Sequence, residues 1–292
     1  MISDKNYHTP VLLQEVLEIL TLKEGDKVID ATAGGGGYSE VFLKTGAKVL
    51  AIDQDPDSIN YLLEKFKNEK DIFLSRDNFS NIKNVAVKYN FLDAKGIVFD
   101  LGTSSHQIEE SKRGFSFMKD EELDMRMDTD TKLTAKEIVN KWSEEELTRI
   151  FLKYGEEHFA QKIAKEIVMQ RKNKKINTTG ELTAIIGKII PRTSKIHPAT
   201  RVFQALRIVV NDEMSVLQKA LADSFEILSR GGRLIVVSFH SLEDRIVKIF
   251  FEEMERKNLA HVIVKKPISA SALELTLNPR SRSAKLRAVE KI

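Results

Sequence analysis

The chain has 292 residues, 42% of them hydrophobic, which is enough for one large domain or two ordinary ones. It has no cysteine, which excludes disulfides and thiolate metal sites and fits a cytoplasmic protein. No apolar run approaches the roughly 18 residues of a membrane span, and the first ten residues lack the basic-then-apolar pattern of a secretion signal. We therefore expect a globular protein without a membrane segment.

The net charge is only +3, but the charges are unevenly distributed along the chain. Residues 160–207 contain eleven Lys or Arg and two acids, residues 256–292 contain nine and two, and residues 109–157 are rich in acids. Two basic tracts favour a polyanionic partner. A solvated lysine-rich surface would have the same composition, so the charge pattern by itself leaves both interpretations open.

Strand and helix patterns alternate through the first hundred residues. The predicted strands are 28–29, 49–52, 71–74 and 96–99, and the predicted helices are 11–20, one from about 39, one from 55 and 82–87. Asp55 and Pro56 are typical of a helix start, with Asp55 as N-cap. The apolar stripe of that helix is expected to be Ile59, Leu62, Leu63 and Phe66. This βαβαβαβ order predicts an α/β fold, a parallel sheet with helices on both faces.

Four consecutive glycines, Gly34–Gly37, follow the strand that ends in Asp30, and the next strand ends in Asp53. Glycines allow a ligand to approach the backbone closely, and an acid at the second strand end can bind ribose hydroxyls. The pattern therefore predicts binding of a cofactor that contains adenosine. A sharp glycine turn between strand and helix, without any ligand, is the alternative.

The glycines do not complete the dinucleotide fingerprint G-x-G-x-x-G/A, because Ser39 stands at its third glycine position. Asp30, just before the glycines, would repel a pyrophosphate but suits the positive sulfonium and ammonium groups of S-adenosylmethionine. The residues thus favour S-adenosylmethionine over a nicotinamide cofactor. A nicotinamide-dependent oxidoreductase is the rival interpretation from another enzyme class.

The alternation ends after Gln107, and no convincing strand follows before Gln204. Predicted helices there are 142–152, 158–169 and 182–190, the last capped by Thr178 or Thr179 and stopped by Pro191. A long helix is then predicted over Thr200–Leu228, ended by Gly231 and Gly232. Further expected elements are a strand at 233–237, a helix at 241–254, strands at 262–264 and 285–289, and weak order over 267–283.

This organisation predicts three segments. Residues 1–107 form the first part of an α/β core, residues 108–204 an inserted helical domain, and residues 205–292 the second part of the core. Ligands of such sheets bind beyond the carboxyl ends of the strands. Candidate site residues at these ends are Asp30, Asp53, Asp100 and Ser238, with Phe79 placed to lie against an adenine ring.

Asp100 follows a short strand that we expect to be buried, so it is either the N-cap of the next turn or a site group that accepts a hydrogen from a target amino group. His106 and His240 have no partner at metal-ligand spacing, and a surface or helix-capping role is favoured for each. The serines Ser104, Ser105 and Ser238 lack a nucleophile-elbow pattern, which argues against a hydrolase triad.

Two basic segments suit nucleic acid. In the first, Arg201 and Arg207 flank Phe203, a combination that can contact phosphates and stack on bases, although a buried amphipathic helix explains the apolar members equally well. The second, residues 279–287, is a serine-rich basic cluster that either clamps a phosphate backbone or forms a mobile tail.

Together, these motifs resemble one family, the bacterial 16S ribosomal RNA cytosine-N4 methyltransferases (RsmH or MraW). The resemblance runs through nearly the whole chain, in the order HTPVLLQEVL, DATAGGGGYS, AIDQDP, DNFSNI, DLGTSSHQI, RGFSF, DMRMD, HPATRVFQALRIVVNDE, SFHSLEDRIVK and NPRSRSAKLR. It implies a class I (Rossmann-like) S-adenosylmethionine-dependent methyltransferase fold with an inserted all-helical domain for RNA recognition. It also implies a cytosine amino group in the decoding region of the small subunit as methyl acceptor.

Matched motif by motif, the family's cofactor contacts would fall on Gly36, Gly37, Tyr38, Asp53, Phe79, Asp100 and Gln107. The chain departs from the family pattern at two positions: the family usually has His at Tyr38 and Pro at His106. A tyrosine can still contact the cofactor through its backbone or its hydroxyl, so the departure concerns a detail of the site.

For such a methyl transfer the enzyme's main task is to align the nitrogen, the methyl carbon and the sulfur, because the sulfonium is already activated. No metal is needed, and a stacked cytosine must swing out to reach the pocket. Asp100 is the first candidate for the environment of the amino group, with His240 and Ser238 second, and the general base stays open.

The alternative without catalysis is a ribosome-assembly factor that keeps the fold alone. The resemblance favours an assembled small subunit over naked 16S ribosomal RNA as substrate, because recognition then uses shape as well as sequence. Whether the protein is a monomer or a homodimer stays open.

Overall fold

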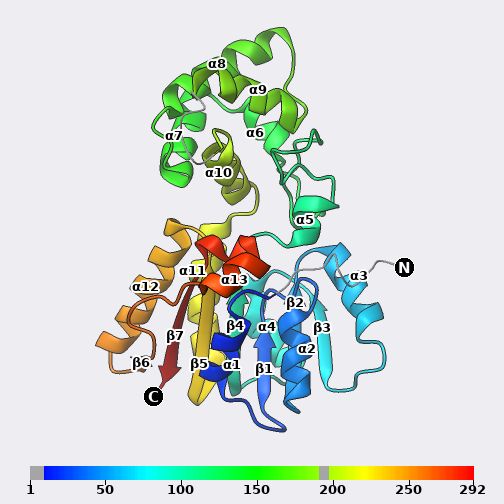
Figure 1. Cartoon of the computed structure of the whole chain (residues 1–292), viewed down its shortest axis with the longest axis vertical. Coiled ribbons are helices and arrows are strands. Elements are labelled where there is room, and N and C mark those ends of the chain that lie inside the picture. The colour runs from blue at the N-terminus through cyan, green and yellow to red at the C-terminus, as the bar shows by residue number, and fades with distance from the viewer. Residues whose placement is uncertain (1–9, 191–196) are drawn as a thin grey trace. The chain divides into compact units, whose positions relative to one another are not determined.

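The computed structural model describes residues 10–190 and 197–292. They form two compact units (Figure 1). The first unit consists of the described residues up to Ser104 together with Met214–Ile292, and the second is Ser105–Glu213. The sequence-based division assigned residues 105–107 and 205–213 to the α/β core, whereas here they lie in the second, helical unit.

A seven-stranded sheet with the order β3-β2-β1-β4-β5-β7-β6 organises the first unit (Figure 1). Its strands are β1 (Lys27–Asp30), β2 (Lys48–Asp53), β3 (Ile72–Arg76), β4 (Ala94–Asp100), β5 (Leu228–Ser238), β6 (Ala260–Val262) and β7 (Lys285–Lys291). The first five pair in parallel, as predicted. At one edge of the sheet, for whose strands no direction was predicted from the sequence, β7 runs antiparallel to both β5 and β6.

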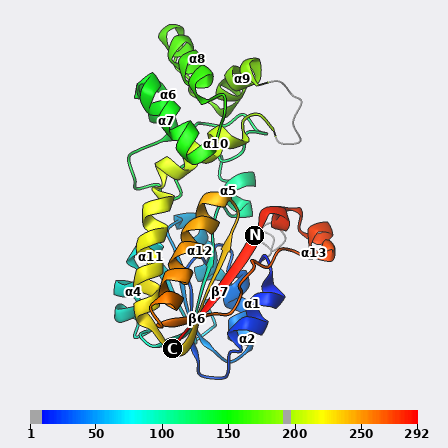
Figure 2. The same cartoon turned by 90° about the vertical axis from the view of Figure 1, so that its left-hand side faces the viewer.

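Helices cover both faces of this sheet, as predicted. They are α1 (Leu13–Leu20), α2 (Gly37–Lys44), α3 (Pro56–Lys65), α4 (Ile82–Lys88), α11 (Glu213–Ile227), α12 (Ser241–Arg256) and α13 (Ala272–Leu277), with 3-10 turns η2 (Phe79–Asn81) and η3 (Pro279–Ser283). Figure 2 shows α4, α11 and α12 on one side and α1 and α2 on the other. Neighbouring strand residues serve opposite cores: Ile29 packs with the first group and Val28 with the second.

The start of α3 follows its sequence signal, because the Asp55 side chain accepts a hydrogen bond from the Asp57 N–H at 3.0 Å and Pro56 occupies the first turn. One member of the predicted stripe is wrong: Leu63 is 53% exposed, whereas Leu62 is fully buried. The apolar face of α3 is therefore narrower than the four-residue pattern suggests.

The single helix predicted over residues 200–228 is in fact two helices, α10 (Thr200–Val210) and α11. Asp212 between them has a left-handed backbone, with φ of 47°. The Asn211 side chain ends α10 by accepting from the Met127 N–H at 2.8 Å and donating to the Met125 carbonyl at 2.9 Å. The local sequence pattern thus places Asn211 in a helix, but its side chain forms hydrogen bonds with residues that are distant in sequence.

The glycines expected to end the long helix lie inside β5. Gly231 has φ of 67°, and a Cβ on Gly232 would stand 2.8 Å from the Ser229 carbonyl oxygen and 2.9 Å from that of Ala94. The β4–β5 register shifts between Ala94 and Gly96. The glycines therefore permit a bulge in the strand, and α11 ends earlier, at Ile227.

The second unit is a helical bundle with a core of its own. Its helices are α5 (Ser105–Glu109), α6 (Ala135–Lys141), α7 (Glu144–Gly155), α8 (Ala160–Asn173), α9 (Thr179–Ile189) and α10. Thr178 caps α9 as predicted, whereas Pro191 lies outside the described residues. Helix α6 was not predicted. The described residues of this unit contain no strand beyond an isolated bridge between Glu122 and Thr178.

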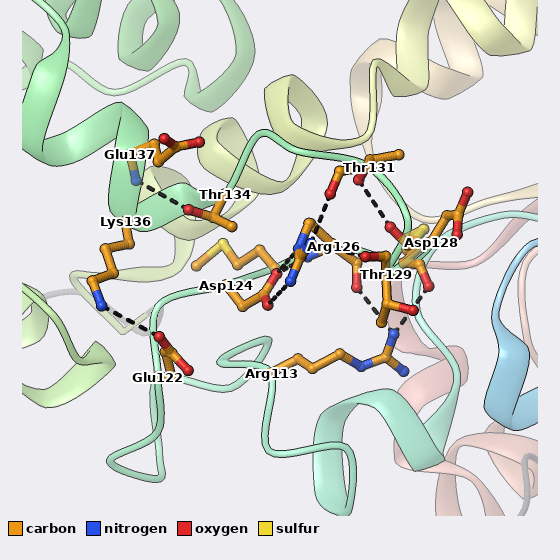
Figure 3. Close-up of polar contacts among 12 residues, drawn as sticks. Arg113, Glu122, Asp124, Arg126, Asp128, Thr129, Thr131, Thr134, Lys136 and Glu137 are labelled. Carbon is orange, nitrogen blue, oxygen red and sulfur yellow. Dashed lines mark hydrogen bonds and ion pairs between the residues drawn. The ribbon is translucent and has the colours of Figure 1, made fainter.

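Two arginines organise the long connection between α5 and α6 (Figure 3). The Arg126 guanidinium forms a bidentate pair with Asp124, with both contacts at 2.7 Å, and also donates to the carbonyls of Thr129 and Thr131. Arg113 donates to the carbonyls of Arg126 and Met127, each at 3.0 Å. This connection has few regular elements, and side chains supply the hydrogen bonds that a helix would otherwise provide.

The segment 267–283, expected to be weakly ordered, contains α13 and η3 and is held to the sheet. Ile268 and Leu286 exchange backbone hydrogen bonds of 3.0 and 2.8 Å. The Leu12 N–H donates to the Glu274 carboxylate at 2.7 Å. Within the described residues, no helix has both the length and the apolar character that crossing a membrane requires.

Candidate cofactor and active site

The parallel order of β3, β2, β1, β4 and β5 brings their carboxyl ends to one edge of the sheet. The chain order reverses between β1 and β4, and ligands of open α/β sheets bind in the crevice at such a point. Asp30, Asp53 and Asp100 are the last residues of β1, β2 and β4. The fold thus collects the three acids that the sequence singled out at the edge where a cofactor is expected.

Asp53 fastens the glycine loop to the second strand. Its Oδ2 accepts the Gly34 N–H at 2.7 Å, and its Oδ1 accepts the Asp55 N–H at 2.8 Å. Burial raises the pKa of Asp53 to about 7, although both backbone hydrogen bonds act in the opposite direction. The carboxylate therefore shapes the loop, and its predicted contact with a cofactor stays a prediction.

The glycines of the loop serve different purposes. Gly34 has φ of 50°, and a Cβ there would make only ordinary van der Waals contacts, 3.9 Å from the Thr32 carbonyl oxygen and 4.0 Å from the Ser104 Cβ. Gly36 has φ of 72°, and a Cβ there would stand 2.6 Å from side-chain atoms of both Leu62 and Phe66 on α3. The left-handed backbone accounts for the glycine at position 34, whereas the glycine at position 36 is also required by packing against a helix. Gly37 is the first residue of α2.

Tyr38 points its side chain into the protein core. It is 3% exposed, its ring stacks on Phe42 at 6.0 Å, and its hydroxyl donates to the Val11 carbonyl. Burial raises the pKa of this phenol well above its usual value. The expectation that the hydroxyl can contact the cofactor is therefore wrong, because that hydroxyl is occupied; its backbone N–H, in the first turn of α2, is the group still placed for a ligand.

Asp30 is fully buried behind the loop, where its Oδ2 accepts the Ser39 hydroxyl at 2.7 Å. Its Oδ1 is buried without a hydrogen-bond partner among the described residues. Burial raises the pKa of Asp30 to about 6, against the lowering effect of the Ser39 hydrogen bond. A buried carboxylate with one idle oxygen favours a cationic neighbour.

Thr32 was not predicted as a site residue from the sequence, but it links β1 to β4, two of the strands that end in an aspartate. Its Oγ1 accepts the Asp100 N–H at 2.6 Å, so the loop after β1 holds the end of β4. The signal available in the sequence was a polar residue two positions after Asp30, where the strand ends. Asp100 itself is half-buried at the end of its strand, the position that the sequence predicted.

Phe79 lies in η2 directly after β3, half-buried, with its ring packed edge-on against Phe99 at 5.5 Å. The loop that carries it is tied to the end of β2, because the Asn78 amide donates to the Gln54 side chain at 2.6 Å and the Asp77 N–H donates to the Asp53 carbonyl at 3.0 Å. Gln54 and Asn78 were missed by sequence reasoning. They hold an aromatic ring beside the strand end that carries Asp53.

Residues 5–292 match the MraW methylase family. The chain belongs to this family. A ribosomal RNA small subunit methyltransferase H of Clostridium botulinum (strain Loch Maree) is 44% identical over 98% of this chain and 99% of its own. The protein of that name from Clostridioides difficile (strain 630) is 43% identical over the same shares. Among solved structures, a putative methyltransferase from Streptococcus mutans in complex with SAH covers 100% of both chains at 16% identity and a TM-score of 0.48.

In this methylase the second candidates for the amino-group environment have structural roles. His240 is the N-cap of α12, as favoured from sequence: its ring accepts the Glu243 N–H at 3.4 Å, and the Glu243 carboxylate accepts the Phe239 N–H at 2.8 Å. Ser238 is 2% exposed and donates to the Lys285 carbonyl at 3.3 Å. Asp100 therefore stays the first candidate.

Gln107, matched to the family's cofactor contacts, is 5% exposed in α5 and belongs to the helical unit. In the same unit, Phe203 is 4% exposed in the bundle core, and the Arg207 guanidinium pairs with Glu213 at 2.8 and 3.0 Å. The interpretation of Phe203 as a base-stacking residue is therefore wrong, and the buried amphipathic helix is correct.

The carboxyl-terminal basic cluster is no mobile tail. Residues 279–283 form η3 and residues 285–291 form β7. Arg287 is 8% exposed and makes a bidentate pair with Asp244 at 2.6 and 3.2 Å, and Lys285 lies 3.3 Å from the same carboxylate. The mobile-tail alternative is therefore wrong, and the pairing of Arg287 inside the first unit argues against a phosphate contact by this member of the cluster.

Proposed function

We propose that the protein transfers a methyl group from S-adenosylmethionine to the N4 amino group of a cytidine in the decoding region of 16S ribosomal RNA. The MraW family and relatives named ribosomal RNA small subunit methyltransferase H support methylation of small-subunit RNA. The observation that carries the cofactor part is the hydrogen bond between Asp53 and the Gly34 N–H, which forms a glycine cradle at the switch point of the sheet.

The residues at this edge fit the proposed cofactor. A Cβ at Gly34 would meet no atom closer than 3.9 Å, so side chains do not crowd the loop backbone there, and the Asp30 oxygen without a hydrogen-bond partner suits a positively charged methionine portion. Asp53 suits the ribose hydroxyls, and the half-buried ring of Phe79 suits the adenine. Gly36, Gly37 and Tyr38 would contribute main-chain atoms, and Gln107 belongs to the proposed contacts by family resemblance alone.

When bound, S-adenosylmethionine supplies an electrophilic methyl group. The chain's own part is then to hold the acceptor amino group in line with it at near-attack distance. Asp100 is proposed to accept a hydrogen bond from that amino group, which orients the nitrogen lone pair toward the methyl carbon. The Thr32 contact to the Asp100 N–H fixes the end of β4 and with it the position of this carboxylate.

We propose that the helical insertion, residues 108–204, recognises the RNA, and that the substrate is the assembled small subunit in the cytoplasm. The helical unit has its own core and thus presents its surface on a rigid support. An assembled subunit offers shape as well as sequence for recognition.

The test is methyl transfer from labelled S-adenosylmethionine to small subunits and to naked 16S RNA, both from cells that lack this gene. Nucleoside analysis of the product is expected to show N4-methylcytidine, formed faster on subunits. Absence of incorporation by folded protein that still binds the cofactor would favour the assembly-factor alternative. Calorimetry with NADH in place of S-adenosylmethionine checks the oxidoreductase alternative, for which NADH binding is the required result.

A further inference from the structure

Helix α8 of the helical unit carries a basic stripe on its outer face. Lys162, Lys165 and Lys172 are exposed, and Met169, between the last two, is 49% exposed. Their spacing of three, four and three residues places all four side chains on one side of the helix. The stripe runs from Lys162 to Lys172, ten residue steps or about 15 Å of helix at about 1.5 Å per step. We call these four residues the α8 stripe.

The three lysines of the stripe form no ion pair with an acid in the described parts of the chain. Other lysines of the same unit behave differently: Lys174 pairs with Glu181, at 2.6 Å. The one acid near the stripe in sequence, Glu166, accepts a hydrogen bond from the Gln170 side chain at 2.7 Å. The positive charge of the stripe is therefore left for an external partner.

An aromatic residue extends the stripe at its amino-terminal end. Phe159, the N-cap residue of α8, is 37% exposed, and the Lys162 ammonium lies 5.8 Å from the centre of its ring. Ammonium groups beside a partly exposed ring suit single-stranded nucleic acid, in which phosphates and bases alternate.

The opposite face of α8 decides between an RNA and a membrane surface. Ile163, Ala164 and Ile167 are fully buried in the core of the helical unit, so the helix has no apolar face free for a lipid layer. A basic helix that binds at a membrane needs such a face. An RNA strand requires only the exposed lysines and the ring.

We propose that the α8 stripe, with Phe159, binds the sugar–phosphate backbone and one base of the ribosomal RNA substrate. The proposal rests on the proposed function, since it assigns a surface to the RNA that the methylase modifies. The lysines contact phosphates without reading sequence. Phe159 stacks on an unpaired base next to them.

The test replaces Lys162, Lys165 and Lys172 together by Gln and measures affinity for small subunits that lack the modification, over a range of salt concentrations. Loss of three phosphate contacts is expected to reduce the slope of log K against log salt by about 2 and to weaken binding about tenfold at low salt. The matched control replaces Lys23, Lys48 and Lys70, three exposed lysines at the amino-terminal edge of the sheet, and is expected to keep the wild-type slope.

A second variant, Phe159→Leu, keeps an apolar side chain but removes the ring face. It is expected to weaken RNA binding about fivefold without changing the salt slope, since no charge is lost. Equal slopes for the α8 variant and its control overturn the proposal, as does a selective loss of binding to anionic vesicles in place of RNA. Cofactor binding, measured in parallel, stays at the wild-type level in all these variants; if wild type itself transfers no methyl group, the proposed function fails independently.

Discussion

The Lys65 ammonium of α3 donates to the Gly35 carbonyl of the glycine loop at 3.1 Å and lies 3.0 Å from the Glu40 carboxylate of α2. The same helix packs Leu62 and Phe66 against Gly36. Helix α3 thus holds the glycine loop both by packing and by a charged hydrogen bond. Lys65 is 21% exposed, so this hydrogen bond is partly shielded from water.

We expect Lys65→Met to weaken S-adenosylmethionine binding about tenfold, because the loop loses a charged hydrogen bond that orders it. Calorimetric titration measures the change, and Lys65→Arg is expected to restore most of the affinity. Lys44→Met is the control: Lys44 pairs with the same Glu40, at 2.7 Å, but has no contact with the loop. Equal losses of cofactor affinity in Lys65→Met and Lys44→Met would show that the pairing of Glu40, and not the hydrogen bond to the Gly35 carbonyl, affects binding.

Asp53→Ala is expected to weaken cofactor binding by about 1–3 kcal/mol, the scale of a lost hydrogen bond to a charged group. The variant loses the tie to the Gly34 N–H as well as the carboxylate offered to the ribose. Asp26→Ala removes a carboxyl group at the opposite end of the sheet, outside the proposed site, and serves as the control. Unchanged affinity in Asp53→Ala would remove this residue from the site.

The free energy of unfolding is expected to depend on pH through Asp30. Burial raises its pKa in the folded state from 3.8 to about 6. Because the folded state holds the proton more tightly, stability falls as the pH rises from about 4 to about 6, by about 3 kcal/mol for this group. The Asp30→Asn variant is expected to lack this fall in stability with rising pH. Urea unfolding at pH 4 and pH 8 checks it, because most of the loss falls between these values: the drop is expected to be smaller in the variant than in the wild type, and equal drops would contradict the assignment.

Gly36→Ala is expected to destabilise the fold by about 2–3 kcal/mol, because a Cβ there collides with Leu62 and Phe66 in a left-handed backbone. Gly34→Ala meets only the backbone strain and is expected to cost about 1 kcal/mol. Urea unfolding of both variants measures the difference. A larger loss of stability in Gly34→Ala than in Gly36→Ala would mean that α3 shifts at little cost to make room for the Cβ at position 36.

Arg287→Met is expected to destabilise the protein by about 3 kcal/mol, because it leaves Asp244 largely buried with Lys285 as its remaining cation. Its RNA binding at permissive temperature is expected to keep the wild-type salt slope, since the guanidinium faces Asp244. Arg282→Met, on an exposed residue of η3, is the comparison for stability. A salt slope that is reduced in Arg287→Met but not in Arg282→Met would show that Arg287 contacts RNA.

The local signals that predicted elements correctly are those in which neighbours in sequence determine the backbone. The N-caps Asp55 and Thr178 mark helix starts because a side chain three or fewer residues away bonds the first N–H groups. Errors arose where distant residues decide. Asn211 reads as helical but bonds Met125 and Met127, far away in sequence, and so breaks a predicted helix in two.

The candidate site shows the same division. The acidic strand ends and the glycines are visible in the sequence because parallel strands bring their carboxyl ends together. The sequence does not show which atoms of those residues are free to contact a ligand. Tyr38 directs its hydroxyl to Val11, and Arg287 pairs with Asp244, because the packing of elements distant in sequence uses these polar groups first.

The sequence alone determined the methylase family, the α/β class with a helical insertion, and the acids and glycines placed for an adenosine-containing cofactor, since these follow from local periodicity and short motifs. Only the tertiary structure decided that Gly36 packs against α3, that the carboxyl-terminal cluster is a 3-10 turn followed by a strand in which Arg287 is buried, and that the three α8 lysines lie on one face without an ion pair in the described parts of the chain. The physical reason is that burial and charge pairing depend on contacts between segments far apart in the chain, which no local pattern specifies.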